Sequence, residues 1–353
     1  MKLLPMLAVL LAAACGPAPA EFPVGFFGVD APADARALAA EGFDAIQSYQ
    51  TEPGRVSALA AEARRRGQLL LVAPHEVEQS ARAAREFPGV FWYLQDEPDV
   101  SGVSRDQLAG LERRVRAWSP EAKTAFVVGD GRKAKDYPGV ADAIMVDWYP
   151  VPHLPLESAG DHVRLTAEAA GGRKVWAVLQ AMDWRNFPQR DPKKKRIGRF
   201  PDAAEIRFMS YDAVLNGASG VWYFTYSTAT GSNLSQTPEL LFAVSGTARE
   251  LRAMAPIFAR GRPIVLPFEI DPDGVRGRAW TYRGRDYVVL INRRKGVDMK
   301  VPEEMLAPRW RPLFEARRDP RELLRPIDGA YYLRQHQVLV LESRLRPRRL
   351  IGL

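Results

Sequence analysis

Apolar and amphipathic segments alternate along residues 24–260 of this 353-residue chain. Eight apolar segments predict strands, because they are nearly continuous in aliphatic and aromatic residues and are bounded by polar or turn-forming ones. They cover residues 24–30, 43–49, 68–76, 90–98, 123–130, 141–150, 174–184 and 220–227. Between them, segments such as RVSALAAEARRRG and DQLAGLERRVRAWS place Ala and Leu at helical spacing, and several stop at Gly. Strands that are apolar throughout are buried on both faces, so eight such units predict a closed (β/α)8, or TIM, barrel.

A doubly wound open sheet is the alternative α/β architecture for this pattern. Such sheets usually carry a Gly-rich phosphate-binding turn directly after the first strand. The segment GFFGVDAP, residues 25–32, lacks that glycine spacing, and no helix start suited to phosphate follows it. We therefore prefer the closed barrel and expect no dinucleotide site and no cofactor.

The pattern changes after a long helix predicted over residues 238–259. Short alternating runs follow, separated by the turn-forming sequences DPDG, RGRD and IDGA. This pattern predicts a small antiparallel β-domain of the sandwich type over residues 261–353, following a barrel domain over residues 23–260.

The first residues, MKLLPMLAVLLAAAC, carry one Lys, an apolar stretch and three alanines before Cys15. This layout is typical of a cleaved secretory signal over residues 1–14, and the stretch is too short to cross a bilayer. The residues before Cys15 resemble a bacterial lipobox. The resemblance implies lipidation of Cys15, a linker over residues 15–22, and a protein anchored by lipid in the bacterial cell envelope. Plain secretion, with Cys15 lost in the removed peptide, is the alternative.

The chain has a net charge of +8, and much of the excess lies in DPKKKRIGR (191–199) and RLRPRRL (344–350). Neither cluster has aromatic residues interleaved for base stacking, so solvated basic loops explain them better than a nucleic-acid site. Contact with anionic lipid headgroups or with an acidic polysaccharide is left as an open alternative.

A (β/α)8 barrel gathers the residues at the carboxyl ends of its strands around one cavity, whatever their separation in the sequence. The ends of the predicted strands are rich in carboxylates, amides and aromatic rings. This mixture suits a sugar, whose C–H faces stack on rings and whose hydroxyls need polar partners. The expected substrate-binding residues are Asp30, Gln47, His75, Asp96, Asp147, Tyr149, Gln180, Trp184 and Tyr223.

The fourth predicted strand ends in FWYLQDEPDV, residues 91–100, where Glu97 precedes a proline that stops strand pairing. In this feature, in DWYP (147–150) and in the region of the eighth strand, the chain resembles the clan A glycoside hydrolases, whose acid/base Glu ends strand four, usually as Asn-Glu-Pro. The resemblance implies that Glu97 is the general acid/base of a glycosidase acting on an oligo- or polysaccharide. Asp96 replaces the Asn, and a second carboxylate there disfavours ionisation of Glu97. An acidic turn that favours the following helix start is the alternative interpretation of DEPD.

The second catalytic carboxylate is less well defined, because the clan places a Glu at the end of strand seven and this chain has Gln180 there. Asp183 is the first choice for nucleophile or base, and Asp147, Asp30 and Glu205 are alternatives. Two carboxylates about 5 Å apart imply retention of the sugar's configuration, and a gap of about 6.5–9.5 Å implies inversion.

Other sites have weaker support. Glu205 follows Asp202 at capping-box spacing, and we favour a helix cap over catalysis there. The chain's 4 His include no pair at the spacing of a zinc motif, and no G-x-S-x-G elbow occurs, so we expect neither a metal nor a serine nucleophile. The rival to a hydrolase is a carbohydrate-binding pseudo-enzyme with the same cleft, for which Gln180 is the best evidence. A structural envelope protein that binds partners through its β-domain is a third hypothesis.

Overall fold

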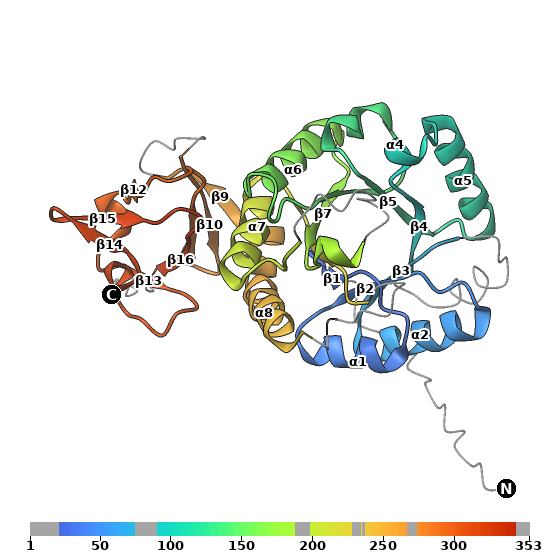
Figure 1. Cartoon of the computed structure of the whole chain (residues 1–353), viewed down its shortest axis with the longest axis horizontal. Helices are drawn as coiled ribbons and strands as arrows, with labels where there is room; N and C mark the ends of the chain where they lie inside the picture. Colours follow the sequence, from blue (N-terminus) through green and yellow to red (C-terminus); the bar gives the residue numbers. More distant parts are fainter. Residues whose placement is uncertain are drawn as a thin grey trace, which may run out of the picture.

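A computed structural model describes residues 21–74, 90–187, 198–227, 234, 237–266 and 274–343. Parallel strands close into a barrel in sequence order, and β8 pairs with β1 (Figure 1). The strands are β1 (Val24–Phe26), β2 (Ala45–Ser48), β3 (Leu69–Val72), β4 (Val90–Asp96), β5 (Lys123–Val128), β6 (Ala143–Trp148), β7 (Lys174–Gln180) and β8 (Val221–Phe224). The predicted barrel is confirmed.

Helices surround the barrel strands (Figure 1). They are α1 (Pro32–Ala40), α2 (Pro53–Arg66), α4 (Pro98–Ser101), α5 (Arg105–Trp118), α6 (Ser158–Ala169), α7 (Ala203–Leu215) and α8 (Pro238–Arg260). The connection from β5 to β6 departs from the predicted β-α unit, because it holds only a 3-10 helix, η1 (Gly131–Asp136). Its sequence, GRKAKD, has a single apolar side chain and so offers no apolar face for a longer helix to bury. None of the helices in the described part of the chain is long and apolar enough to cross a membrane.

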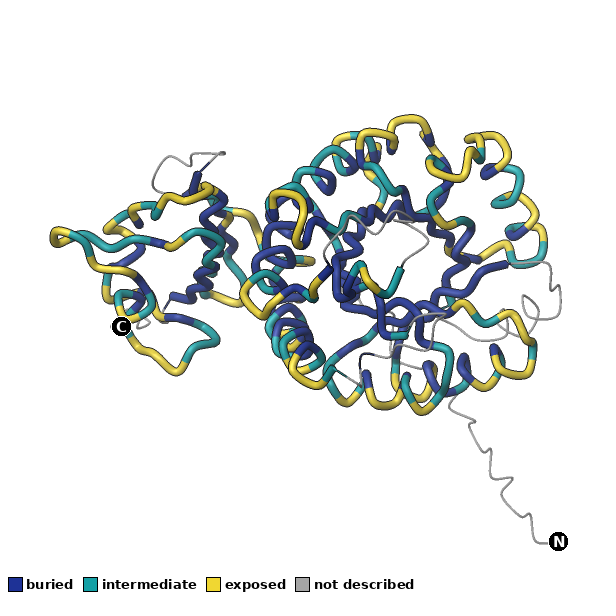
Figure 2. The backbone as a smooth tube through the Cα atoms, in the orientation of Figure 1, coloured by how far each residue is buried: buried dark blue, intermediate teal, exposed yellow. Residues whose placement is uncertain are grey.

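Strand alternation divides the barrel into two hydrophobic cores. Phe91, Tyr93 and Trp222 point inward and pack in the centre of the barrel. Trp92 and Tyr223, their neighbours in the sequence, belong to the outer core between strands and helices. Figure 2 shows the strands and the helix faces turned toward them as buried.

The chain after α8 forms two antiparallel sheets. One contains β9 (Arg262–Ile264), β10 (Val275–Tyr282), β11 (Arg285–Asn292), β13 (Trp310–Pro312) and β16 (Val338–Ser343); the other contains β12 (Met299–Lys300), β14 (Arg325–Ile327) and β15 (Ala330–Leu333). Leu290, Leu339 and Leu333 belong to one core that both sheets share. The predicted all-β domain is confirmed, and its larger sheet packs against α7 and α8 (Figure 1).

Charged side chains connect this β-domain to the barrel. Asp212 on α7 is fully buried, and Arg293, which follows β11, lies 3.1 Å from it and 2.8 Å from Asp161 on α6. Burial raises the pKa of Asp212 to about 7, although the nearby Arg293 lowers it. The domain interface therefore contains a carboxyl group that titrates near neutral pH.

Candidate active site

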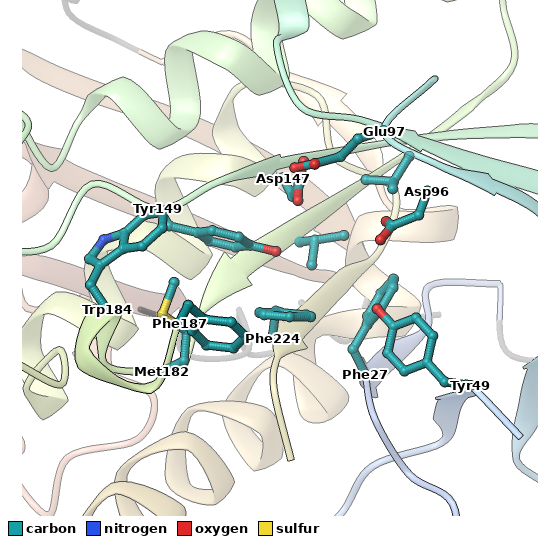
Figure 3. Close-up of a pocket in the computed structure, with 12 residues that line it drawn as sticks. Phe27, Tyr49, Asp96, Glu97, Asp147, Tyr149, Met182, Trp184, Phe187 and Phe224 are labelled. Atoms are coloured by element: carbon teal, nitrogen blue, oxygen red, sulfur yellow. The ribbon is translucent and has the colours of Figure 1, made fainter. Parts of the chain in front are cut away.

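A cavity of about 400 Å³ opens at the carboxyl ends of the barrel strands. In Figure 3, Asp96, Glu97 and Asp147 occupy one side of this cavity, and the rings of Trp184, Phe187 and Phe224 lie across from them. The lining residues are Phe27, Tyr49, Asp96, Glu97, Val127, Asp147, Tyr149, Val178, Met182, Trp184, Phe187 and Phe224. The cavity thus has a wall of carboxyl groups and a wall of aromatic rings.

Asp96 and Glu97 are consecutive, yet both line the cavity, whereas neighbours on a regular strand point to opposite faces. Two local irregularities explain this. The pairing of β4 with β5 shifts register between Tyr93 and Asp96, which is the mark of a bulge. Glu97 then adopts a left-handed conformation, with φ 43° and ψ 61°, immediately before Pro98 begins α4. Such a conformation costs on the order of 1–3 kcal/mol for a residue with a side chain, so the surroundings hold Glu97 in place.

The carboxyl groups of Glu97 and Asp147 lie side by side and are hydrogen-bonded to each other (Figure 3). The Tyr149 hydroxyl also donates a hydrogen bond to Asp147, which is only 8% exposed. Burial is the main cause that raises the pKa of Asp147 well above its usual range, and the negative charges of Glu97 and Asp96 raise it further. Asp147 therefore keeps a proton to higher pH than an isolated carboxyl group does, and the adjacent Glu97 carboxyl group can share it.

Tyrosine hydroxyls surround the three acids. Tyr93, inside the barrel, donates a 2.6 Å hydrogen bond to Asp96 Oδ1. Burial raises the pKa of Tyr149 well above 10, with the carboxylates as additional causes. This phenol therefore stays protonated and can donate a hydrogen bond in the site. Tyr49, which also lines the cavity, is 42% exposed.

Gly129, just after β5, lets the Glu97 side chain lie against the backbone. A Cβ atom at position 129 would lie 3.2 Å from Glu97 Oε1 and 2.9 Å from Val100 Cγ2. The turn is also fixed by Asp99, whose carboxylate accepts hydrogen bonds of 3.0 Å from the backbone N–H groups of Gly129 and Asp130. The position of the Glu97 carboxyl group therefore depends on the absence of a side chain at residue 129.

Asp183, predicted as the nucleophile or base, is not part of this cavity. It is 2% exposed and begins the 3-10 helix η2 (Trp184–Asn186). Its Oδ1 accepts a 2.8 Å hydrogen bond from the backbone N–H of Arg185, and its Oδ2 accepts one of 2.8 Å from Arg185 Nε. The structure does not support the prediction of a catalytic Asp183, because the carboxylate is turned to its own loop and paired with Arg185 there.

Gln180 and Tyr223 were predicted to bind substrate hydroxyls, and the structure places neither side chain at the cavity. The Gln180 amide is completely buried, accepts a hydrogen bond from Val151 N at 2.8 Å and donates one to Val151 O at 2.9 Å. Tyr223 is also fully buried on the outer side of β8, with its hydroxyl 2.8 Å from Ser210 Oγ. Both side chains stabilise the barrel and do not line the cavity.

Asp30 and Gln47, two further predicted substrate ligands, hold the backbone beneath the cavity. Asp30 accepts hydrogen bonds from Ser48 Oγ (2.7 Å) and Tyr49 N (3.0 Å). Gln47 is fully buried, and its Oε1 accepts a 3.2 Å hydrogen bond from Gly28 N. Neither residue lines the cavity, so direct contact with a substrate is not supported for them.

Of the remaining predicted site residues, some lie at the cavity and others fall outside the described residues. Asp96, Glu97, Asp147, Tyr149 and Trp184 meet at the cavity, as expected from their places at strand ends. His75 and Cys15 lie outside the described residues.

Three aromatic residues that were not predicted also line the cavity: Phe27, Phe187 and Phe224. Phe224 was detectable, because it shares the inward face of β8 with Trp222. Glu205 forms the predicted capping box with Asp202, through two 2.9 Å hydrogen bonds, and takes no part in the cavity. Within the described ranges, no group of three or more His, Cys, Asp or Glu side chains could hold a metal ion.

No protein-family model matches this chain, and no curated protein matches its sequence. Solved structures do resemble it. An alpha-amylase from Anoxybacillus has 11% identity and a TM-score of 0.54, with 93% of this chain and 98% of that chain covered. A GH30 endoxylanase from Clostridium papyrosolvens has 12% identity and a TM-score of 0.51, with 93% and 97% covered. A structure described as a glycoside hydrolase has 12% identity and a TM-score of 0.56, with 92% of each chain covered. At such identities the similarity establishes the fold, which is a (β/α)8 barrel followed by a β-domain.

Proposed function

We propose that this protein is a glycoside hydrolase in which the Glu97–Asp147 pair supplies the proton that cleaves a glycosidic bond. The observation that carries the proposal is the hydrogen-bonded pair itself, placed at the mouth of a (β/α)8 barrel opposite a wall of aromatic rings. Solved proteins of similar fold include an amylase, an endoxylanase and a protein solved in complex with maltose, which adds support for a carbohydrate substrate.

The proposed reaction begins with proton transfer from the pair to the glycosidic oxygen. The C–O bond then breaks, the leaving sugar departs as an alcohol, and positive charge develops at the anomeric carbon. The remaining carboxylates stabilise that charge. Water adds to the anomeric carbon and its proton returns to the pair, so the enzyme ends in its starting state.

The roles within the pair follow from how close the two carboxyl groups are. Hydrogen-bonded carboxyl groups are nearer to each other than the separation of about 5 Å that a retaining glycosidase uses. Asp147 is therefore assigned as the group that shares a proton with Glu97, and Asp96 replaces Asp183 as the candidate second carboxylate. Tyr93, through its 2.6 Å hydrogen bond, fixes the orientation of Asp96.

A second candidate function is carbohydrate binding without turnover. The same contact between Glu97 and Asp147 favours it, because neither an anomeric carbon nor a water molecule fits between two carboxyl groups that touch. In this alternative, the three acids accept hydrogen bonds from hydroxyls while the aromatic wall stacks on the ring.

One experiment separates the two functions. The parent protein, Glu97→Gln and the control Asp183→Asn are assayed for hydrolysis across a broad glycan panel and for binding by calorimetry. Catalysis by the pair predicts turnover in the parent and the control, and a loss of about 10²–10⁴-fold in Glu97→Gln with binding retained. Binding in all three proteins without turnover supports the non-catalytic function. Absence of both binding and turnover in the parent contradicts the proposal.

We also propose that the protein is secreted and anchored by a lipid on Cys15, on the basis of the signal-like residues 1–14. Labelling with a radioactive fatty acid is expected to mark the parent protein and to leave Cys15→Ser unlabelled and soluble. Equal labelling of the two proteins contradicts the proposal.

A further inference from the structure

Counted over each domain as a whole, the net positive charge lies in the β-domain, because acidic residues elsewhere in the barrel balance the basic cluster at 191–199. Residues 1–260 contain 30 Lys and Arg and 30 Asp and Glu, whereas residues 261–353 contain 20 and 12. The barrel part is therefore neutral overall, and the β-domain part accounts for the whole of the +8. A domain with such an excess attracts polyanions over a distance of about 8–10 Å at physiological ionic strength.

The smaller sheet of the β-domain has one covered face and one outer face. Leu333 is fully buried, and Tyr331 and Met299 pack against the same core, so these side chains define the covered face. Alternation along β15 then places Tyr332 on the outer face. The strand register pairs Tyr332 with Lys300 on β12 and with Arg325 on β14, so all three side chains share that face.

Lys300, Tyr332 and Arg325 thus form a row across the sheet, with the aromatic ring between two cations. Neighbouring strands lie about 4.8 Å apart, so the two cations are separated by roughly 10 Å. Lys300 and Arg325 are exposed. Arg325 pairs with Asp298 at 3.0 Å, and Lys300 makes no ion pair with a residue in the described ranges.

More basic residues lie beside one end of the row. Arg294 and Lys295 are exposed in the turn after β11, and Arg334 is exposed just after β15. A 2.9 Å hydrogen bond from Gly296 N to Gln335 Oε1 joins these two segments. The positive surface therefore continues along the edge of the sheet.

We propose that the row formed by Lys300, Tyr332 and Arg325 binds a carboxylated polysaccharide, of the polyuronate class. An aromatic ring offers a stacking surface for the C–H face of a sugar ring, and the flanking cations attract its carboxylates. Lys300 is the cation without an ion pair in the described ranges, and Arg325 shares its charge with Asp298. A membrane-binding surface would instead be expected to present Trp, Phe or Leu to the lipid, and the row has none of these. The site is separate from the barrel cavity and does not depend on catalysis there.

The test is native affinity electrophoresis of the full chain in gels containing alginate, with dextran gels as the neutral comparison. Alginate is expected to retard the parent protein and dextran is not. Lys300→Gln/Arg325→Gln is expected to raise the apparent Kd for alginate about tenfold, as the loss of two exposed charge contacts implies. Tyr332→Ala should weaken binding similarly, and Tyr332→Phe should retain it, because the ring remains.

The matched control is Arg113→Gln/Arg114→Gln, which removes two exposed charges from α5 on the barrel. This control variant should bind alginate like the parent. If both double variants lost alginate affinity equally, net charge alone would explain the binding, and the proposal would be overturned. Binding to phosphatidylglycerol vesicles as tight as to alginate, lost in the same variants, would also overturn it in favour of a lipid surface. If thermal melting shows that Arg325→Gln unfolds, Lys300→Gln and Tyr332→Ala carry the test. Unchanged binding in those two single variants would contradict it.

Discussion

Replacing Gly129 by Ala tests the site without removing any of its chemical groups. The added Cβ would lie 3.2 Å from Glu97 Oε1 and 2.9 Å from Val100 Cγ2. Contacts below about 3.4 Å must relax to reach ordinary carbon and oxygen separations of roughly 3.5–4.0 Å. The Glu97 carboxyl group is therefore expected to move by roughly 0.3 Å and the Val100 side chain by roughly 0.6 Å.

The magnitude follows from how sensitive catalysis is to position. A misplacement of about 1 Å costs on the order of 10²-fold in rate, so a shift of a few tenths of an ångström in Gly129→Ala should lower kcat by about 3–10-fold with a smaller change in KM. Overpacking of this kind also destabilises by about 1–3 kcal/mol. The assay is steady-state hydrolysis of a substrate from the glycan panel, with thermal melting of the same samples.

Two companion variants make the result interpretable. Gly246→Ala on α8 meets no atom within 4 Å, so it should keep full activity and gain about 0.5–1 kcal/mol of stability. Val100→Ala combined with Gly129→Ala relieves the contact with Val100 but not the one with Glu97, and should recover stability more than kcat. Normal turnover in a folded Gly129→Ala protein would refute the reasoning, because the Glu97 carboxyl group would then not need its present position.

Three further predictions concern the other acids. Asp183→Asn should leave kcat/KM within about twofold of the parent, because Asp183 only holds its own loop through Arg185; a loss of about 10²-fold or more would restore it as a catalytic residue. Asp147→Asn should lower kcat/KM about 10²-fold and change the alkaline limb of the pH profile. The reason is that the pKa of Asp147 is raised, so the parent loses its catalytic proton, and with it its activity, as pH rises. An unchanged pH profile would contradict the shared proton. For Asp212, the folded pKa of about 7 exceeds the unfolded value of about 3.9, so its contribution to stability is lost as pH rises from about 4 to about 7. Urea midpoints should show this loss in the parent and not in Asp212→Asn, and equal pH dependence in both would exclude it.

The barrel was predictable because its strands are buried on both faces, which leaves uninterrupted apolar runs in the sequence. The same runs end in polar residues at the cavity, so Asp96, Glu97, Asp147 and Tyr149 could be placed by position alone. The β5–β6 connection was wrongly predicted to contain an α-helix. Its segment η1 is short and polar, so an α-helix there would have no apolar face to bury.

The second carboxylate could not be predicted, because the outcome depends on loop contacts. Asp183 lies near a strand end but is turned to Arg185, two residues further along the chain. Gln180 lies on the inward face of β7, but its amide is used by the backbone of Val151. The bulge and the left-handed backbone that bring Asp96 and Glu97 to the same cavity also leave no periodic signal in the sequence.

A crystal structure of Glu97→Gln with a bound oligosaccharide from the glycan panel tests the assignment of the proton donor most directly. The assignment predicts that a glycosidic oxygen lies within about 3.2 Å of the side chain at position 97, with a sugar ring against the Trp184 and Phe224 side of the cavity. An oligosaccharide seated in the cavity with every glycosidic oxygen out of reach of that side chain would contradict it.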